Sequence, residues 1–201
     1  TPVTVASLLG EDGARGAVQG SHSVPGTFTR AAWEEYVNDA IREAANAELS
    51  STDWVLEATV QDDLTLAGSP EHVAKELTAL YKADYAREWS RFLQGVSVAE
   101  FGSFEQAAAQ MDRIGDPRNS PLRQLLEAVN RETVWDNPGA QRAAEGGGLV
   151  AWFNRVVLGR TSQAGGEDGK PTAVAMGPIG REFQGLARLM QPRDGQPALA
   201  D

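Results

Sequence analysis

The stretch that decides how this chain folds is residues 24–33, which read VPGTFTRAAW. Pro25-Gly26 favours a tight turn, because proline restricts φ and glycine tolerates a positive φ. Thr29 suits the N-cap of a helix that begins one residue later. Phe28 and Trp33 flank this cap at the N′ and N4 positions of a hydrophobic staple. The sequence therefore predicts a turn that leads directly into a helix.

The helix after this turn is expected over residues 30–50, where apolar residues recur with a 3.6-residue period. Its expected buried face consists of Trp33, Tyr36, Val37, Ala40, Ile41, Ala44 and Ala47. Residues 1–27 are predicted to be mostly irregular, with a short helical turn near residues 5–9. Residues 54–66 leave two alternatives open, a small β-hairpin turned by Gln61-Asp62-Asp63 and an extended loop.

Three further helices carry their own start signals. Ser69-Pro70 opens a long helix, which Gly95 is expected to end. Its apolar stripe is rich in aromatic residues and is expected to pack into a core: Val73, Leu77, Leu80, Tyr81, Tyr85, Trp89, Phe92 and Leu93. The Ser-x-x-Gln spacing at 103–106 is that of a capping box and predicts a shorter helix that ends near Ile114. Ser120-Pro121 starts another helix, with an apolar face of Leu122, Leu125, Leu126 and Val129.

The composition changes after Trp135. Residues 136–178 are rich in glycine and proline and contain one short apolar helix candidate, 149–158. A last amphipathic stretch places Ile179, Phe183, Leu186, Leu189 and Met190 on one face, and its packing partner is expected beyond the chain's end. We therefore expect a mainly α-helical protein with a bundle-like domain at 1–135. Long Gly-rich loops with a short helix come next at 136–178, and a terminal helix and tail at 179–201.

Composition limits the function classes. The 201 residues are 41% hydrophobic and carry a net charge of −10, which is ordinary for a globular protein and disfavours nucleic acid and anionic membrane surfaces. The absence of cysteine excludes disulfide and thiolate chemistry but leaves the compartment open. The longest apolar run, at 149–153, is too short to cross a bilayer. Because the chain opens at Thr1 without Met, we expect a fragment of a longer protein or a processed product.

No motif in the sequence predicts a catalytic, metal or cofactor site. Ser21-His22-Ser23 places its residues side by side, where a nucleophile and its base rarely face each other. The glycines at 165–171 have the wrong spacing for a phosphate loop, and Pro171 replaces the required Ser or Thr. The two distant histidines, His22 and His72, make poor zinc spacing. One enzyme class stays open, a helical cell-wall hydrolase that uses a pair of carboxylates drawn from Glu88, Glu100 and Glu127.

The order of landmarks along the chain resembles the periplasmic region of the IcmF/TssM-type inner-membrane proteins of bacterial type VI secretion. The landmarks are VPGxFTR with Trp33 shortly after it, DWVL at 53–56, LYxxDYxxxW at 80–89, NSPLxxLL at 119–126 and NRET at 130–133. A weaker match lies at residues 181–186. The resemblance covers about residues 20–135. Ala32 stands where the family commonly has Gly, and 136–178 has no counterpart in the family.

The resemblance implies a structural scaffold without enzymatic activity, in the periplasmic portion of an inner-membrane protein. The implied partners are an outer-membrane lipoprotein, a second inner-membrane protein and further copies of the chain, with membrane contact only through flanking segments. No cofactor and no nucleic acid is expected. Exposed apolar residues would then carry the function. The candidate partner-binding residues lie in the short apolar helix between the Gly-rich loops: Trp152, Phe153, Val156 and Val157.

Overall fold

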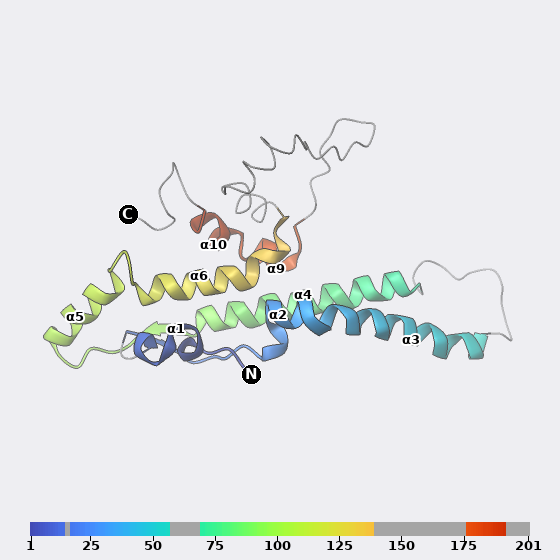
Figure 1. The fold of residues 1–201 in the computed structure, drawn as a ribbon, viewed down its shortest axis with the longest axis horizontal. Helices are drawn as coiled ribbons and strands as arrows, with labels where there is room; N and C mark the ends of the chain where they lie inside the picture. The colour runs from blue at the N-terminus through green and yellow to red at the C-terminus, as the bar shows by residue number, and fades with distance from the viewer. Residues whose placement is uncertain (15–16, 57–68, 139–175, 192–201) are drawn as a thin grey trace, which may run out of the picture. The chain divides into compact units, whose positions relative to one another are not determined.

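The computed structural model describes residues 1–14, 17–56, 69–138 and 176–191. The chain forms two compact units, Thr1–Gln106 and Ala107–Asp201 (Figure 1). The described structure is mainly α-helical with a small two-stranded antiparallel sheet, which confirms the predicted fold class. None of the described helices is long and apolar enough to cross a membrane.

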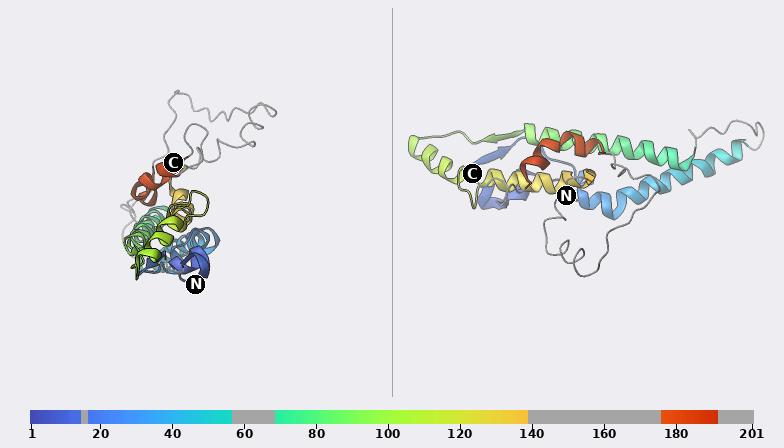
Figure 2. Two further views of the ribbon diagram at one scale, coloured as in Figure 1. Left: turned by 90° about the vertical axis from the view of Figure 1, so that its left-hand side faces the viewer. Right: turned by 90° about the horizontal axis from the view of Figure 1, so that it is seen from above.

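The first unit is built around two long neighbouring helices, α3 and α4, which lie side by side in both views of Figure 2. Its elements are α1 (Val5–Ala14), β1 (Val18–Gly20), η1 (Gly26–Phe28), α2 (Arg30–Ala32), η2 (Trp33–Val37), α3 (Asn38–Leu56), α4 (Pro70–Gln94) and β2 (Val96–Val98). β1 pairs with β2 antiparallel, so that Val18 lies opposite Val98. The sheet therefore joins the start of the unit to the segment that comes directly after α4.

The N-terminal region is more regular than its sequence predicts. Thr4 and Ser7 cap α1 reciprocally, because the backbone N–H of each donates to the other's hydroxyl, at 2.8 and 3.1 Å. Val3 and Val24 form an isolated antiparallel bridge. The prediction of a mostly irregular stretch over 1–27 is thus wrong, whereas the helical turn predicted near residues 5–9 is confirmed within α1. The backbone pairings that order it join residues far apart, and local periodicity does not report them.

The predicted helix start at residue 30 is confirmed. The Thr29 hydroxyl accepts a hydrogen bond from the Ala32 N–H at 3.2 Å, which is N-cap geometry. One π-helical turn, η2, interrupts the helix, and its closing bond runs from the Asn38 N–H to the Trp33 carbonyl. The helix then continues as α3 to Leu56, six residues beyond the predicted end at 50. The residues 57–66 of the proposed hairpin lie outside the described residues, whereas Trp54 to Leu56 are helical.

The π turn changes which face of α3 is buried. Ala45 is buried, whereas the predicted face residues Tyr36, Ala40, Ala44 and Ala47 are exposed. A π turn holds one extra residue, so every later side chain is rotated by about 100° from its expected place. A strict 3.6-residue period cannot anticipate that rotation. The predicted face is therefore correct for its beginning, Trp33, and wrong for most of its later residues.

Both predicted ends of α4 are confirmed. The Ser69 hydroxyl accepts from the His72 N–H at 3.2 Å, and Pro70 occupies the first turn. The helix ends at Gln94, but Gly95 has a φ of −80° and needs no left-handed conformation. Its small size matters instead, because a Cβ there would lie 2.8 Å from the Ser21 hydroxyl and 3.3 Å from His22. Glycine allows the N-terminal segment to approach the end of α4.

The second unit contains short helices. They are α5 (Phe104–Ile114), in which the division between the units falls, α6 (Pro121–Thr133), η4 (Val134–Asp136), α9 (Pro178–Glu182) and α10 (Gln184–Leu189). Ser120 caps α6 as predicted, with its hydroxyl accepting from the Arg123 N–H at 3.3 Å. The domain boundaries proposed at 135 and 178 stay predictions, since 139–175 lie outside the described residues.

The predicted terminal helix is two helices with a break at Phe183. Its buried apolar side chains are those of Ile179, Phe183 and Ala187, whereas the predicted face residue Leu189 is 45% exposed. α10 packs on α6 and α9, so the expectation of a partner beyond the chain's end is not needed to explain the buried residues.

Candidate functional site

Two aromatic side chains of α4 hold the backbone of the turn at residues 24–29. The Trp89 indole N–H donates to the carbonyl of Phe28 at 2.8 Å, and the Tyr81 hydroxyl donates to the carbonyl of Thr27 at 2.7 Å. Each aromatic side chain supplies one hydrogen-bond donor to this backbone while packing its ring. The turn and α4 are thereby joined by side-chain-to-backbone bonds as well as by apolar contact.

The ring packing extends these contacts into a continuous row. Phe28 and Trp33 both pack on Tyr81, with ring centroids 5.5 and 5.3 Å apart, so the predicted staple residues meet on α4. The row continues from Tyr85 to Trp89 at 6.3 Å and from Trp89 to Phe92 at 5.5 Å. We call these six residues the aromatic row: Phe28, Trp33, Tyr81, Tyr85, Trp89 and Phe92. Its spacings lie in the range of favourable aromatic pairs.

The burial of the row increases along α4. Tyr85, Trp89 and Phe92 are fully buried, which confirms the predicted core, whereas Trp33 and Tyr81 are half-buried. Leu80, predicted on the same stripe, is 65% exposed, so that part of the prediction is wrong. Burial, and secondarily the nearby Tyr36, raises the pKa of Tyr81 above its usual range. The phenol is therefore held in its neutral, hydrogen-bond-donating form.

The N-terminal segment, residues 1–3, requires the glycine of the VPG turn. A Cβ at Gly26 would lie 2.6 Å from the carbonyl oxygen of Thr1, which is backbone and cannot rotate away. The bridge between Val3 and Val24 fixes that segment in place, with N···O distances of 2.8 and 2.9 Å. The landmark turn therefore has a structural explanation that needs no ligand, since it lies between the N-terminal segment and the aromatic row.

A histidine–carboxylate pair lies at the end of α4. His22 Nε2 lies 2.9 Å from Glu88 Oε2, and Arg91 Nη1 lies 3.0 Å from Glu88 Oε1. The side chain of Glu88 is 14% exposed, and both of its oxygens are engaged. The neighbouring Ser21 hydroxyl donates to the Gly95 carbonyl at 3.3 Å, not to His22. The sequence singled out His22 and Glu88 separately, and their pairing across 66 positions has no local signal.

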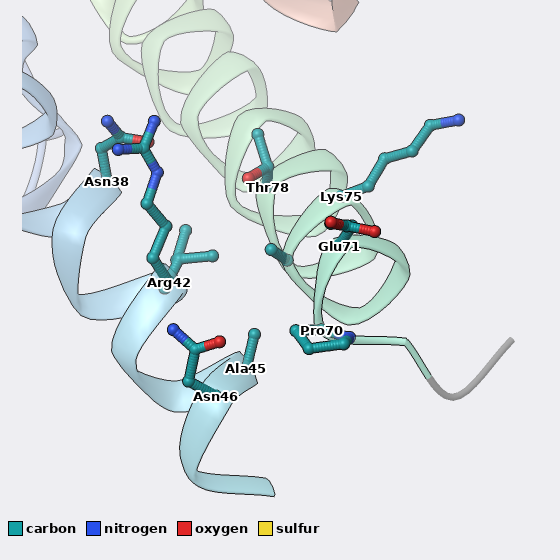
Figure 3. Close-up of a pocket in the computed structure, with 10 residues that line it drawn as sticks. Asn38, Arg42, Ala45, Asn46, Pro70, Glu71, Lys75 and Thr78 are labelled. Atoms are coloured by element: carbon teal, nitrogen blue, oxygen red, sulfur yellow. The ribbon is translucent and has the colours of Figure 1, made fainter. Parts of the chain in front are cut away.

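A groove of about 490 Å³ lies between α3 and α4 (Figure 3). Its floor is formed by small or apolar residues, among them Ala45, Ala74 and Pro70. Arg42 borders it on α3 and Glu71 on α4, so the rim carries both signs of charge. The small side chains explain the hollow, because alanines facing each other leave the space that larger residues would fill.

Asp136 joins two distant segments of the second unit. This buried carboxylate accepts from the backbone N–H groups of Ile179 at 3.0 Å and Gly180 at 3.4 Å. The Gly177 N–H donates to the Asp136 carbonyl at 3.2 Å. Sequence reasoning missed this contact because its partners lie 43 and 44 positions apart. The only local cue is an acidic residue at the end of the short helix η4.

The structure describes some of the residues that the sequence singled out for chemistry or partner binding, and not others. The proposed partner-binding residues Trp152, Phe153, Val156 and Val157 lie outside the described residues, as does the rejected glycine motif at 165–171. Glu127 pairs with Arg123 at 2.8 Å, and Glu100 is exposed. His72 pairs with Glu76 one turn away at 3.2 Å. Within the described ranges, no group of three or more His, Asp or Glu is arranged to hold a metal ion.

These features define a helical protein in which a capped turn is held by an aromatic row. A family model described as "IcmF-related: Intracellular multiplication and human macrophage-killing" matches residues 1–134, which contain the turn and the row. The chain belongs to the IcmF-related family.

One relative is the type VI secretion system component TssM1 of Pseudomonas aeruginosa. It is 33% identical over 108 residues, which are 54% of this chain and 9% of that protein. The chain thus corresponds to a small part of this relative's length. No solved structure matches the chain significantly.

Proposed function

We propose that this chain is part of a type VI secretion component and serves there as a structural scaffold in the periplasm, acting through protein–protein contacts. The observation that supports this most strongly is the family match over residues 1–134. The similarity to TssM1, whose name describes a type VI secretion component, points the same way. The proposed location is the periplasmic portion of a bacterial inner-membrane protein.

The architecture of the first unit suits a scaffold. The side chains of Tyr81, Trp89 and Thr29 form hydrogen bonds with the chain's own backbone. These bonds and the antiparallel sheet order the unit internally. A unit ordered before it meets a partner loses less conformational entropy on binding. The proposed partners are an outer-membrane lipoprotein, a second inner-membrane protein and other copies of the chain.

The location is tested by single-cysteine labelling, because this chain has no cysteine of its own. Glu43 is exposed on α3, so Glu43→Cys in the full-length protein offers a reactive thiol. In intact cells with a permeabilised outer membrane, a maleimide that cannot cross the inner membrane should label this variant. The full-length protein without the change is the control. Labelling only after the inner membrane is lysed would contradict a periplasmic location.

The scaffold role is tested by assembly. Trp152→Ala combined with Phe153→Ala in the full-length protein should reduce co-purification of the secretion complex while the Tm of the isolated chain stays unchanged. Leu80→Ala, at a residue that is 65% exposed on α4, is the matched apolar control. Undiminished co-purification would remove these residues from the proposed contact surface. A large loss of Tm would make them part of the core.

A second candidate function is the carboxylate-dependent cell-wall hydrolase. The observation in its favour is the His22–Glu88 pair, in which Nε2 and Oε2 lie 2.9 Å apart. We propose that the chain is not an enzyme, because both Glu88 oxygens are already committed to His22 and Arg91. Purified peptidoglycan incubated with the chain should release no soluble fragments. Hydrolysis that disappears in Glu88→Gln and persists in Glu127→Gln would establish the enzyme instead.

A further inference from the structure

The helix α5 has an apolar stripe that the described structure leaves uncovered. None of its eleven residues is buried. Phe104 is 91% exposed and Met111 is 51% exposed. At 100° per residue these two side chains share one face with Ala107, Ala108 and Ile114. Contiguous exposed apolar surface of this kind marks interaction sites in proteins that are otherwise well packed.

The stripe continues into a groove within the second unit. Ile114, the last residue of α5, lines a groove of about 230 Å³ together with Leu122 and Leu126 of α6. Leu122 is 38% exposed although α6 buries its neighbour Leu125 completely. The uncovered apolar surface therefore extends from α5 onto one side of α6.

The charges beside this surface are acidic. Glu105 and Asp112 are seven residues apart and lie along one edge of the stripe, whereas the other edge carries the amides of Gln106 and Gln110. Asp116 lines the groove. The arginine that also lines it, Arg123, is already bound, since it donates to Glu127 and to the Pro117 carbonyl, both at 2.8 Å. The edge thus offers carboxylates to a partner.

We propose that the α5 stripe and the adjoining groove bind an amphipathic helix whose apolar face is flanked by lysine or arginine. α5 is about 16 Å long at 1.5 Å per residue, enough to contact roughly three turns of a partner helix. The carboxylates at 105 and 112 disfavour an anionic membrane surface. They equally disfavour a second copy of the same surface, which would bring like charges together. The inference deepens the scaffold proposal by naming a partner chemistry, and it rests on that proposal.

The test uses the purified 201-residue chain and two synthetic helical peptides. Both peptides have the same leucine pattern, one with lysine and the other with glutamate at every polar position. The Leu/Lys peptide should bind at least about tenfold more tightly than the Leu/Glu peptide, as measured by fluorescence anisotropy. Phe104→Ser combined with Met111→Ser should abolish binding without lowering the Tm. Glu105→Lys combined with Asp112→Lys should reverse the preference between the peptides.

Controls separate this site from the general attraction of a −10 chain for cations. Glu35→Lys combined with Glu43→Lys makes the same charge change on exposed residues of η2 and α3, outside the proposed surface, and should leave the preference intact. Equal binding of both peptides, or reversal by this control pair, overturns the proposal. Two other outcomes would also overturn the proposal. One is a dimer of the chain in sedimentation that the Phe104/Met111 variant no longer forms. The other is binding of the chain to phosphatidylcholine vesicles that this variant loses. The co-purification test of the scaffold is independent of these results.

Discussion

α5 and α6 are neighbours in sequence, and both have an apolar face opposite a charged one, yet only α6 buries its face. α6 has five buried residues, among them Leu125 and Val129, and it contacts α10 and η4. α5 has none. Both helices begin with a serine cap, Ser103 and Ser120, so their local signals are equivalent. An amphipathic pattern predicts that a face exists, and only tertiary contacts decide whether this chain covers it.

α4 shows the same contrast within a single helix. Its second half carries the buried residues Tyr85, Trp89 and Phe92, whereas Leu80 on the first half is exposed. The buried half includes Trp89, which donates to the Phe28 carbonyl of the turn at residues 24–29. Covered and uncovered faces should therefore respond very differently to truncation of apolar side chains.

The largest effect is expected at the centre of the covered half of α4. Trp89→Ala should lower the free energy of unfolding by about 3–5 kcal/mol, because it removes a fully buried ring and the donor to the Phe28 carbonyl. Urea melting monitored by circular dichroism measures the loss. A change below about 1 kcal/mol would mean that the aromatic row does not form the core.

A smaller loss is expected from the covered face of α6. Leu125 is fully buried, so Leu125→Ala should cost about 2–5 kcal/mol through lost burial and the remaining cavity. The same urea melt provides the measurement, and the exposed Leu122, three residues earlier, is the internal control. If the two truncations cost the same, the face of α6 is not covered as described.

The starts of three helices were predictable because their signals are local. Thr29, Ser69 and Ser120 each cap the helix that they were predicted to cap, and in each case the bond closes within three residues. The aromatic row was predictable in part, since Tyr85, Trp89 and Phe92 have helical spacing. These features depend only on residue type and short-range order.

The remaining features depend on contacts that no short window contains. The π turn at η2 rotates the face of α3, so Ala45 is buried in place of the predicted alanines. The pairing of β1 with β2 and the His22–Glu88 contact join residues that are more than sixty positions apart. For the candidate site, the capping box at 103–106 predicted α5 as a helix, but no local signal indicates that its apolar stripe stays uncovered.

Substitution of Asp136 tests whether a buried polar contact stabilises the second unit, as the buried apolar faces do. Asp136→Ala leaves the buried N–H groups of Ile179 and Gly180 without this acceptor and should cost about 1–3 kcal/mol. Asp136→Asn keeps a carbonyl oxygen and should cost less. Thermal melting of the unchanged chain, Asp136→Ala and Asp136→Asn measures the loss of stability in each variant. Equal losses for both variants would show that the charge, not the acceptor, is what matters.

The half-buried Tyr81 should make the stability of the folded chain depend on pH. Its pKa is raised in the folded chain, so the folded state keeps a proton that the unfolded state loses above about pH 10. The contribution of Tyr81 to stability is thus fully present below that pH and decreases as the pH rises further. Urea melts at about pH 8 and about pH 11 should show a smaller decrease for Tyr81→Phe than for the unchanged chain. Parallel decreases would contradict the assignment.

The smallest effect is expected on the uncovered face. Met111→Ala on α5 should change the free energy of unfolding by less than about 0.5 kcal/mol, because Met111 is 51% exposed and alanine is at least as good a helix former. The measurement is the urea melt used for Leu125→Ala, so the two helices are compared under one condition. If Met111→Ala costs about 2 kcal/mol or more, α5 is covered by the chain itself. The surface proposed for a basic amphipathic helix would then be part of the core, and the difference between α5 and α6 would disappear.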